Sequence, residues 1–181
     1  MNVQTTFIED LKVIFPDVFK DKRGFFFESW NIKKYSQFGI TENFVQDNHS
    51  KSSKGILRGL HLQTKNSQAK LVRVVNGAVL DVVVDLRKTS KTFGNYFSIK
   101  LSSEENNQLF IPQGFAHGFL TLTEEVDFLY KTSDYYYPEY EETLIWNDKE
   151  INIDWGLNNL HPIISDKDLN GKSFEQIKKI I

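Results

Sequence analysis

The chain has 181 residues, of which 40% are hydrophobic and 14% aromatic, and this composition predicts one globular domain with an aromatic-rich core rather than a disordered chain. The formal net charge of −2 gives no bulk electrostatic reason to bind nucleic acid or an acidic membrane surface, and the absence of cysteine excludes disulfides and thiolate metal sites. The start lacks the basic and apolar regions of a signal peptide, and no segment approaches the ~18 apolar residues of a membrane span. We therefore expect a soluble, cytoplasmic protein.

The first segments of the chain alternate between apolar runs and turns. Loosely alternating apolar residues predict a strand within 7–15, which ends at the turn dipeptide Pro16-Asp17. In the segment 19–30, turn residues at 21–24 precede the aromatic run Phe25 to Phe27, and that run favours a strand. We expect these phenylalanines to lie in the core and in a dimer interface rather than to form a ligand platform.

Helical signals are confined to two places. Asn31 and Gly39 have the positions of the N-cap and the terminator of a short helix. The apolar residues of 173–181 recur at helical spacing, which predicts a C-terminal amphipathic helix packed on the domain. Between them, we expect a short strand over 44–49 and a polar loop over 51–54.

From residue 56 onward, short strands follow one another with little helix between them. The dipeptide Asn76-Gly77 is the signal of a two-residue hairpin turn, and the stretch 55–77 before it also reads as a hairpin. Strands at this spacing predict an all-β sandwich or barrel rather than a parallel α/β sheet. The expected strands are 56–63, 70–75, 78–86, 96–101, 108–112, 118–123 and 127–132.

Two polar patterns lie on these strands and resemble the paired motifs of the cupin superfamily, a double-stranded β-helix of the jelly-roll kind. The first consists of Gly55, His61, Gln63, Lys70 and Gly77, and the second is PQGFAH, with Pro112, Gly114 and His117. A metal-binding cupin would have histidine in place of Gln63 and a carboxylate in place of Lys70. Because a protonated lysine is no metal ligand, we expect a metal-free site built from His61, Gln63, Lys70 and His117.

A closer resemblance covers roughly residues 8–170. Ten segments stand in the order and spacing of the dTDP-4-dehydrorhamnose 3,5-epimerase family, the third enzyme of the dTDP-L-rhamnose pathway. They are KRGFFFES, FVQDNHS, LRGLHLQ, KLVRVVNG, IPQGFAHGF, FLYK, YYYPE, IWND, IDW and SDKD. Two segments, 64–69 and 157–162, depart from the commonest family versions and lie near the expected pocket mouth.

The resemblance implies an isomerase that works without a cofactor. A 4-keto sugar has acidified C–H bonds at C3 and C5, so epimerisation needs a base on one face, an acid on the other and a cation at the enolate oxygen. A histidine side chain has an unperturbed pKa of ~6.5 and can accept a proton near neutral pH, which makes a histidine in this pattern, His61, the natural base. By resemblance, Asp168 in SDKD orients it, Tyr130 in FLYK is the proton donor, and Lys70 stabilises the enolate.

The same resemblance supplies the residues that hold the substrate, a dTDP-4-keto-6-deoxyglucose. The arginines suit a diphosphate because their planar guanidinium groups bind oxygens bidentately. The family is homodimeric, with part of the nucleotide pocket supplied by the neighbouring subunit, and we expect Arg23 to act across that interface. Besides Lys70, the implied binding residues are Arg23, Glu28, Gln46, Asp47, Asn48, Arg58, His117, Glu141 and Lys167, with Phe19 and Tyr136 as candidates for stacking.

Each role has a structural alternative. A histidine in a strand, such as His61, is often only a hydrogen-bonded structural residue, and His117 could cap the loop beside the Pro-Gly turn. Tyr130 could pack in the core with Tyr135 to Tyr137, and Asp168 could be a plain helix cap. His49 and His161 match nothing that demands chemistry and are expected in loops or on the surface.

The function has alternatives as well. A related enzyme could epimerise only one carbon or accept another nucleotide sugar, and the number of deuterons taken up from solvent separates these cases. A non-catalytic sugar-binding cupin would bind the nucleotide sugar equally well after His61→Asn. Gln63 and Lys70 disfavour a metal-dependent oxygenase.

Overall fold

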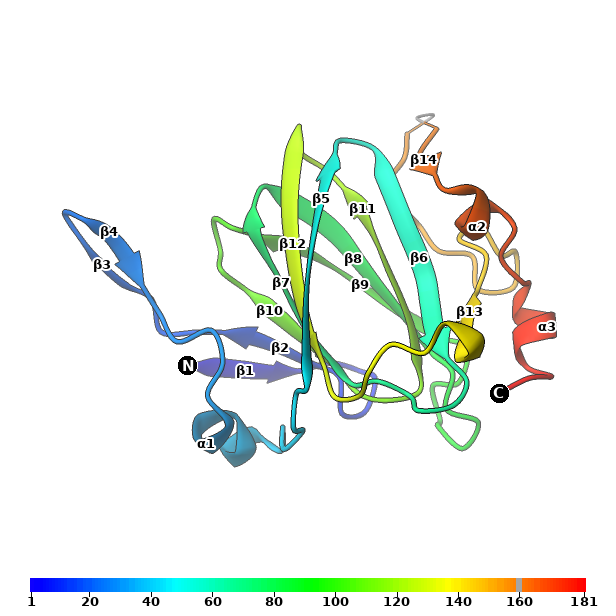
Figure 1. Ribbon diagram of the computed structural model, residues 1–181, viewed down its shortest axis with the longest axis horizontal. Helices are drawn as coiled ribbons and strands as arrows, with labels where there is room; N and C mark the ends of the chain where they lie inside the picture. The colour runs from blue at the N-terminus through cyan, green and yellow to red at the C-terminus, as the bar shows by residue number, and fades with distance from the viewer. Residues whose placement is uncertain (159–160) are drawn as a thin grey trace.

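Two antiparallel β-sheets packed face to face form the body of the molecule in the computed structural model, which describes residues 1–158 and 161–181 (Figure 1). The expected all-β sandwich is confirmed. One sheet has the order β1 (Asn2–Thr5), β2 (Lys12–Phe15), β10 (Gln108–Ile111), β7 (Lys70–Asn76), β12 (Glu125–Thr132), β5 (Gln46–Ser53). The other has the order β13 (Glu141–Thr143), β6 (Ile56–Gln63), β11 (Phe115–Thr121), β8 (Ala78–Asp85), β9 (Tyr96–Ser102), and β14 (Ile163–Ile164) pairs in parallel with β6.

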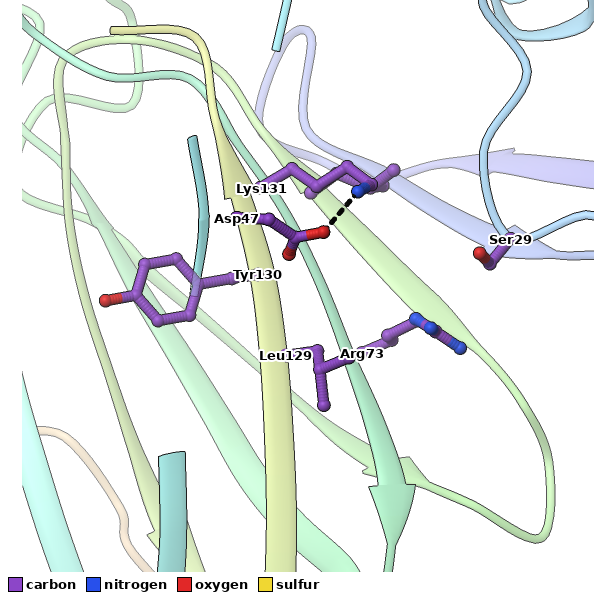
Figure 2. A pocket seen from close by; sticks show the side chains of 7 residues that line it. Ser29, Asp47, Arg73, Leu129, Tyr130 and Lys131 are labelled. Carbon is purple, nitrogen blue, oxygen red and sulfur yellow. Dashed lines mark hydrogen bonds and ion pairs between the residues drawn. The ribbon is translucent and has the colours of Figure 1, made fainter. Parts of the chain in front are cut away.

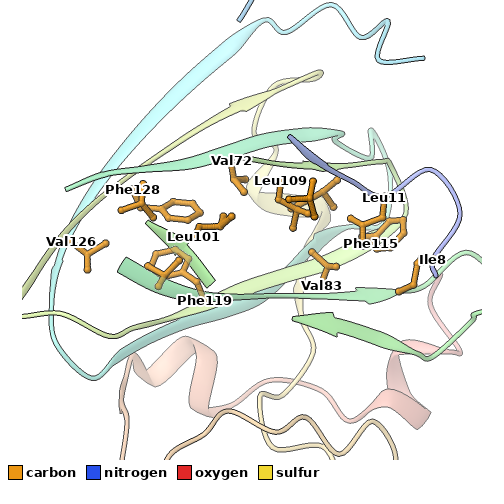
Figure 3. Packing of buried hydrophobic residues seen from close by; sticks show 14 residues of the cluster. Ile8, Leu11, Val72, Val83, Leu101, Leu109, Phe115, Phe119, Val126 and Phe128 are labelled. Atoms are coloured by element: carbon orange, nitrogen blue, oxygen red, sulfur yellow. The ribbon is translucent and has the colours of Figure 1, made fainter. Parts of the chain in front are cut away.

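The core lies between the sheets and continues behind the second one. Side chains alternate along β8, so Val79 and Val83 belong to the sandwich core, where Figure 3 shows Val83. Val82 and Val84 pack on the other face, with residues of the C-terminal segment. Both faces of β8 are therefore buried, which explains why six of the eight residues of AVLDVVVD are apolar. Aromatic stacking tightens the sandwich core, with the ring centroids of Phe119 and Phe128 4.2 Å apart.

The helices are short, and both helical signals in the sequence are confirmed. Asn31 caps α1 (Ile32–Tyr35), which runs into η1 (Ser36–Phe38) and ends at Gly39 in the left-handed conformation. Near the C-terminus lie α2 (Asp166–Leu169) and α3 (Phe174–Ile177), and η2 (Pro138–Tyr140) precedes β13. Among the described residues, no helix is long and apolar enough to cross a membrane.

The C-terminal helix is shorter than the predicted span 173–181. Ser173 and Gln176 form a capping box at its start, and Phe174 and Ile177 are buried against the second sheet. The helix ends at Ile177, and Ile180 remains 41% exposed. The apolar spacing thus located the packed turn, but the spacing alone did not show where the helix ends.

The first sheet differs from the prediction in two places. The strand expected within 7–15 is confirmed but covers only Lys12–Phe15, and β1 was not anticipated. The loop expected over 51–54 is largely strand, because β5 extends from Gln46 to Ser53 and includes His49, which bonds Asp127 on β12. β5 is an edge strand that exposes one face to solvent and turns polar residues inward, so it lacks the apolar alternation that identifies other strands.

The two hairpins predicted around Asn76-Gly77 are also absent from the described structure. β6 and β8 belong to one sheet and β7 to the other, so the chain crosses the sandwich at each connection instead of pairing neighbours. Gly77 has φ +78°, as a primed turn requires, but here the turn carries the chain between sheets. Local turn chemistry cannot distinguish these two uses, because the partner strands come from elsewhere in the chain.

A two-stranded arm, formed by β3 (Phe19–Asp21) and β4 (Gly24–Phe26), projects away from the sandwich (Figure 1). Phe25 and Phe26 are 60% and 67% exposed, so the expectation that the phenylalanine run lies in the core is wrong for these two residues. Phe27 is partly covered and lies under the Arg73 guanidinium, 5.9 Å from ring centroid to Cζ. The prediction of a dimer interface here stays a prediction.

Candidate active site

A cavity of about 140 Å³ opens between the two sheets. Strands from both sheets contribute to its wall, so residues from distant parts of the chain meet there. Five residues singled out in the sequence line it together: Arg58, His61, Lys70, His117 and Tyr130. The remaining lining residues are Ser50, Gly118, Phe119 and Phe128.

His61, on β6, forms a close pair with Asp168 on α2. The distance from His61 Nε2 to Asp168 Oδ1 is 2.6 Å, and the Gly59 backbone N–H donates to Asp168 Oδ2 at 3.1 Å. Although burial raises the pKa of Asp168, the hydrogen bond and charge of His61 hold it below its usual value. Because the carboxylate occupies Nε2, Nδ1 is the ring nitrogen left for proton transfer.

The alternative that Asp168 is only a helix cap is wrong. Ser165 is the N-cap of α2, and its hydroxyl accepts from the Asp168 backbone N–H. The Asp168 side chain instead points into the protein and is 5% exposed. The short helix therefore serves to hold this carboxylate against the imidazole.

A second histidine–carboxylate pair lies deeper in the same cavity. His117 Nε2 is 2.9 Å from Asp81 Oδ2, and the His117 ring stacks near Phe128 with centroids 6.1 Å apart. Burial lowers the pKa of His117 and raises that of Asp81, although each partner's charge opposes the shift of the other. His117 lies within β11 and does not cap the preceding loop, so that alternative is wrong.

Lys70 faces these pairs from β7. Burial lowers the pKa of its ammonium to about 8, while the negative charges of Glu141 and Asp81 oppose the shift. A lysine with a pKa near the working pH can supply a positive charge or a proton at a developing oxyanion. Such a shift is typical of a functional group held in a cavity.

Tyr130, on β12, projects into the cavity from the opposite sheet. In Figure 2 its ring lies on the other side of β12 from Asp47, Lys131 and Arg73. Burial raises the pKa of its phenol, and the charge of Glu141 raises it further, so the group remains a proton donor at neutral pH. Tyr135 and Tyr136 are 56% and 48% exposed, and the alternative of one buried tyrosine cluster is wrong.

A polar network surrounds the entrance. The Tyr136 hydroxyl donates to Glu141 Oε2 at 2.7 Å, and Lys167 forms an ion pair with the same carboxylate. Gln46 accepts from the Tyr136 backbone N–H at 3.1 Å and donates to Asn48 at 2.9 Å. These five residues, all singled out in the sequence, are thus brought together next to the cavity.

Four other predicted residues lie away from the cavity in this chain. Asp47 faces outward from β5 and pairs with Lys131 at 2.5 Å (Figure 2). Arg23 is at the tip of the projecting arm, where it binds Asp21, and Phe19 is 65% exposed on the same arm. Glu28, just beyond the arm, pairs with Lys34.

Gln63 was expected to belong to the site, and this is wrong. Its amide nitrogen donates to the carbonyls of Asn66 and Tyr135 at 2.8 and 3.3 Å, and its oxygen accepts from the Tyr137 N–H at 2.8 Å. The side chain therefore ties two loops together and does not line the cavity. In the part of the chain that the structure describes, no group of three or more His, Cys, Asp or Glu residues is arranged to hold a metal ion.

Comparison with known proteins identifies the group to which this site belongs. A family model described as dTDP-4-dehydrorhamnose 3,5-epimerase matches residues 5–176. The chain belongs to the dTDP-4-dehydrorhamnose 3,5-epimerase family. The enzyme of that name from Shigella flexneri is 52% identical over 176 residues, which cover 96% of each chain. The resemblance stated from the sequence motifs is thereby confirmed.

Solved structures agree with the family and with the cupin jelly roll. The Legionella pneumophila dTDP-6-deoxy-D-glucose-3,5-epimerase, in complex with dTDP-4-keto-L-rhamnose, is 47% identical with a TM-score of 0.94, covering 97% of this chain and 94% of that one. A 3'-monoepimerase from Streptomyces bikiniensis, in complex with dTDP-quinovose, is 30% identical with a TM-score of 0.89, covering 96% and 88%. The fold is thus shared by epimerases that differ in the number of carbons they change.

The epimerase cavity depends on a close approach of two glycines. A Cβ atom at Gly59 would lie 2.6 Å from the Gly118 Cα and from the His117 carbonyl oxygen, and one at Gly118 would lie 2.5 Å from the Arg58 carbonyl oxygen. The register of β6 and β11 shifts at this point. The two glycines therefore let the strands that bear His61 and His117 lie close together.

Sequence reasoning missed Asp81, the most deeply buried charged group of the epimerase cavity. It was hidden in the apolar run AVLDVVV, which was read only as a strand. An acidic residue inside a run that is buried on both faces is itself a signal, because an unpaired carboxylate there would be costly. Ser50, Phe119 and Phe128 also line the cavity; they belong to the segments FVQDNHS, IPQGFAHGF and FLYK, but no role was predicted for them.

Proposed function

We propose that this protein is an isomerase that epimerises C3 and C5 of dTDP-4-keto-6-deoxyglucose to give dTDP-4-keto-L-rhamnose for dTDP-L-rhamnose biosynthesis. The observation that carries the proposal is the His61–Asp168 pair, at 2.6 Å, lining one cavity with Lys70 and Tyr130 in a chain of this family. The reaction needs only proton transfer, which these groups can supply without a cofactor. We place the protein in the cytoplasm.

The first step is removal of a proton from the carbon next to the C4 carbonyl. His61 accepts that proton through Nδ1, and the electron pair of the C–H bond moves to the carbonyl oxygen. Asp168 stabilises the imidazolium that forms, because its carboxylate already accepts from Nε2. Lys70 supplies positive charge to the developing enolate, where a desolvated cation acts strongly.

The second step returns a proton to the opposite face of the same carbon. Tyr130 comes from the sheet opposite His61, so its hydroxyl can approach the sugar ring from the other side. The enolate pair takes the phenolic proton, and the carbonyl is restored as Lys70 releases the oxygen. One carbon is thus inverted, which leaves His61 protonated and Tyr130 as a phenolate. His61 then releases its proton to solvent and Tyr130 takes one from solvent, so both groups are restored before they act on the second carbon.

The remaining residues hold the nucleotide. Arg58, at the cavity wall, suits the diphosphate, and the network of Tyr136, Glu141 and Lys167 borders the path that leads outward from it. Gln46 holds Asn48 through a hydrogen bond of 2.9 Å, so the two amides act together in substrate binding. The Asn48 amide nitrogen is buried without a hydrogen-bond partner among the described residues, which suits a group that waits for a ligand.

The arm completes the site of a second copy in a homodimer. Phe19, Arg23 and Glu28 lie too far from the cavity of their own chain, yet the arm exposes aromatic rings together with a guanidinium group, a combination that suits a nucleotide diphosphate. Asp47 lies on the outer sheet face, where it pairs with Lys131.

The test is incubation of the purified protein with dTDP-4-keto-6-deoxyglucose in deuterium oxide, with NMR used to locate the deuterons. We expect deuterium at both C3 and C5, and His61→Asn, checked for folding by circular dichroism, should abolish both signals. Deuterium at C3 alone would instead support monoepimerisation, the activity named for the Streptomyces bikiniensis neighbour. Absence of exchange by folded wild-type protein would sink the proposal.

The dimer is tested by mixing two inactive variants. Arg23→Ala leaves the arm defective, and His61→Asn leaves the cavity defective. If the arm serves the neighbouring subunit, a mixed dimer carries one intact site, so we expect exchange to return to about a quarter of the wild-type rate after random reassociation. If each arm served its own chain, every site would stay defective and the mixture would remain inactive.

A further inference from the structure

Asp81 is a buried carboxylate that the proposed proton transfers do not use. Its residue exposure is 0%, and it stands on β8 between valines that pack into the two cores. Its Oδ2 bonds His117, but its Oδ1 has no hydrogen-bond partner in the described part of the chain. A buried, half-satisfied carboxylate is costly, so a compensating charge must lie nearby.

That charge is the ammonium of Lys70, which lines the same cavity as His117, the hydrogen-bond partner of Asp81. The charge of Asp81 opposes the lowering of the Lys70 pKa, and the charge of Lys70 opposes the raising of the Asp81 pKa. With neutral His117, the three groups sum to zero charge, which is the favourable state for a desolvated cluster. The charged or titratable groups that face Lys70 from the surrounding strands are Arg58 and His61 on β6, Asp81 on β8, His117 on β11, Tyr130 on β12 and Glu141 on β13.

We propose that Asp81 is a positioning residue of the epimerase: its charge keeps Lys70 protonated in the cavity, and its bond fixes His117 as a neutral ring that presents Nδ1 to a sugar hydroxyl. Because Nε2–H is donated to Asp81, Nδ1 is an acceptor. Asp81 touches neither the sugar nor the enolate itself. The inference rests on the proposed function for its activity readout but not for its lysine readout.

The direction of the effect follows from the charges. Lys70 has a pKa of about 8 because burial opposes its charge while Asp81 and Glu141 favour it. Removing the charge of Asp81 leaves the burial cost and weakens the support, so the pKa must fall further. The enzyme would then lose its cation at a lower pH, and the basic limb of the pH–rate profile would move to lower pH.

The variant is Asp81→Asn, which keeps the size of the side chain and an oxygen that can accept from His117 but removes the charge. We expect the basic limb of the kcat profile, measured by deuterium exchange, to move down by about one pH unit, and kcat at pH 8 to fall about fivefold. The matched control is Asp85→Asn on the same strand, whose carboxylate binds Arg87 away from the cavity. Its basic limb should stay at the wild-type pH.

The second readout is independent of catalysis. Reductive methylation with formaldehyde and cyanoborohydride, followed by peptide mass spectrometry, reports the unprotonated fraction of Lys70 at each pH. We expect a midpoint near pH 8 for the wild type, about one unit lower for Asp81→Asn, and near the wild-type value for Asp81→Glu, which restores the charge. If Asp81→Asn fails to fold, the smaller Asp81→Ser carries the same comparison.

The outcomes separate the two proposals. The methylation midpoint of Lys70 could be lower in Asp81→Asn than in the wild type while the wild type catalyses no deuterium exchange. That result supports the role of Asp81 in the charge of Lys70 and overturns the proposed epimerisation. A basic limb and a methylation midpoint that both stay in place in folded Asp81→Asn overturn the role of Asp81, whatever the activity. A loss of stability without any pH shift also counts against it, because a purely structural carboxylate would behave in that way.

Discussion

The molecule contains two histidine–carboxylate pairs, the open pair His61–Asp168 and the closed pair His117–Asp81, whose histidines lie on neighbouring strands. The pairs differ in exposure and in the hydrogen bonds of their carboxylates. His61 on β6 and His117 on β11 are register partners. The His61 side chain is 31% exposed and that of His117 is 7% exposed. Asp168 accepts from an imidazole and a backbone N–H and has a lowered pKa, whereas Asp81 accepts only from its imidazole and has a raised one.

The difference teaches that a shared pair of groups does not imply a shared role. The open pair has a ring nitrogen that a substrate can reach and a fully satisfied carboxylate to support the charge it gains. The closed pair lies where a new charge would be expensive, so it is suited to hold a fixed state. The exposure of the imidazole and the number of hydrogen bonds to its carboxylate, rather than residue type, distinguish the base His61 from the supporting His117.

The largest expected effect is the loss of the open histidine. His61→Asn removes the base but leaves the cavity lining nearly intact, so kcat for exchange should fall by about 10³-fold or more. Calorimetry with dTDP provides the check on binding, which should change little because the nucleotide is held elsewhere. Equal losses of binding and turnover would show that His61 only shapes the cavity.

Loss of the proton donor Tyr130 should slow inversion of the carbon but leave proton exchange with solvent. In Tyr130→Phe, His61 can still abstract a proton and return a deuteron to the same face. We expect inversion to fall by about 10²-fold while exchange at the retained configuration persists. NMR of the sugar distinguishes the two results, and complete loss of both would place Tyr130 in substrate binding instead.

The open carboxylate should matter less than its histidine. Asp168→Asn keeps an acceptor near Nε2 but removes the charge that stabilises the imidazolium, so kcat should drop by about 10²-fold with little change in KM. The Gly59 N–H contact can persist to the amide oxygen, and a thermal melt checks that the loop is still held. An unchanged kcat would remove Asp168 from the mechanism.

The closed histidine should give the smallest effect. His117→Gln retains a donor for Asp81 and the charge balance with Lys70, so we expect a rise in KM of about tenfold and a basic limb that stays in place. This result would contrast with Asp81→Asn, where the limb moves. A 10³-fold loss in kcat would instead make the two pairs equivalent and break the comparison.

The sequence was most informative where one contiguous segment contains both a strand pattern and a site residue. The span predicted for β6, 56–63, matches the structure, and its motif named the histidine, because strand periodicity and site chemistry coincide there. Asp168 and Tyr130 were placed only by family resemblance, since no local pattern reveals which distant strands meet. The same limit explains the wrong hairpins, where Gly77 sets a turn but not a partner.

Residue polarity led to wrong predictions both for polar segments and for apolar ones. The second half of the polar β5 was taken for a loop because one face of this strand is exposed to solvent and the other borders a cavity. Asp81 was passed over because its neighbours are apolar, and Gln63 was assigned to the site although its amide satisfies loop backbone. The exposed arm phenylalanines were assigned to the core because residue type alone cannot distinguish an interior from a surface awaiting a partner.

Gly59 and Gly118 have no Cβ atom, and this lets the strands that carry His61 and His117 lie close together. In a library that samples every residue at every position, alanine at either glycine should score among the inactive variants, although it carries no functional group and touches no substrate. Such a result would resemble the loss of a catalytic residue. An engineer who wished to enlarge the cavity for a bulkier sugar should therefore leave these two positions alone and vary Phe128 on β12 instead.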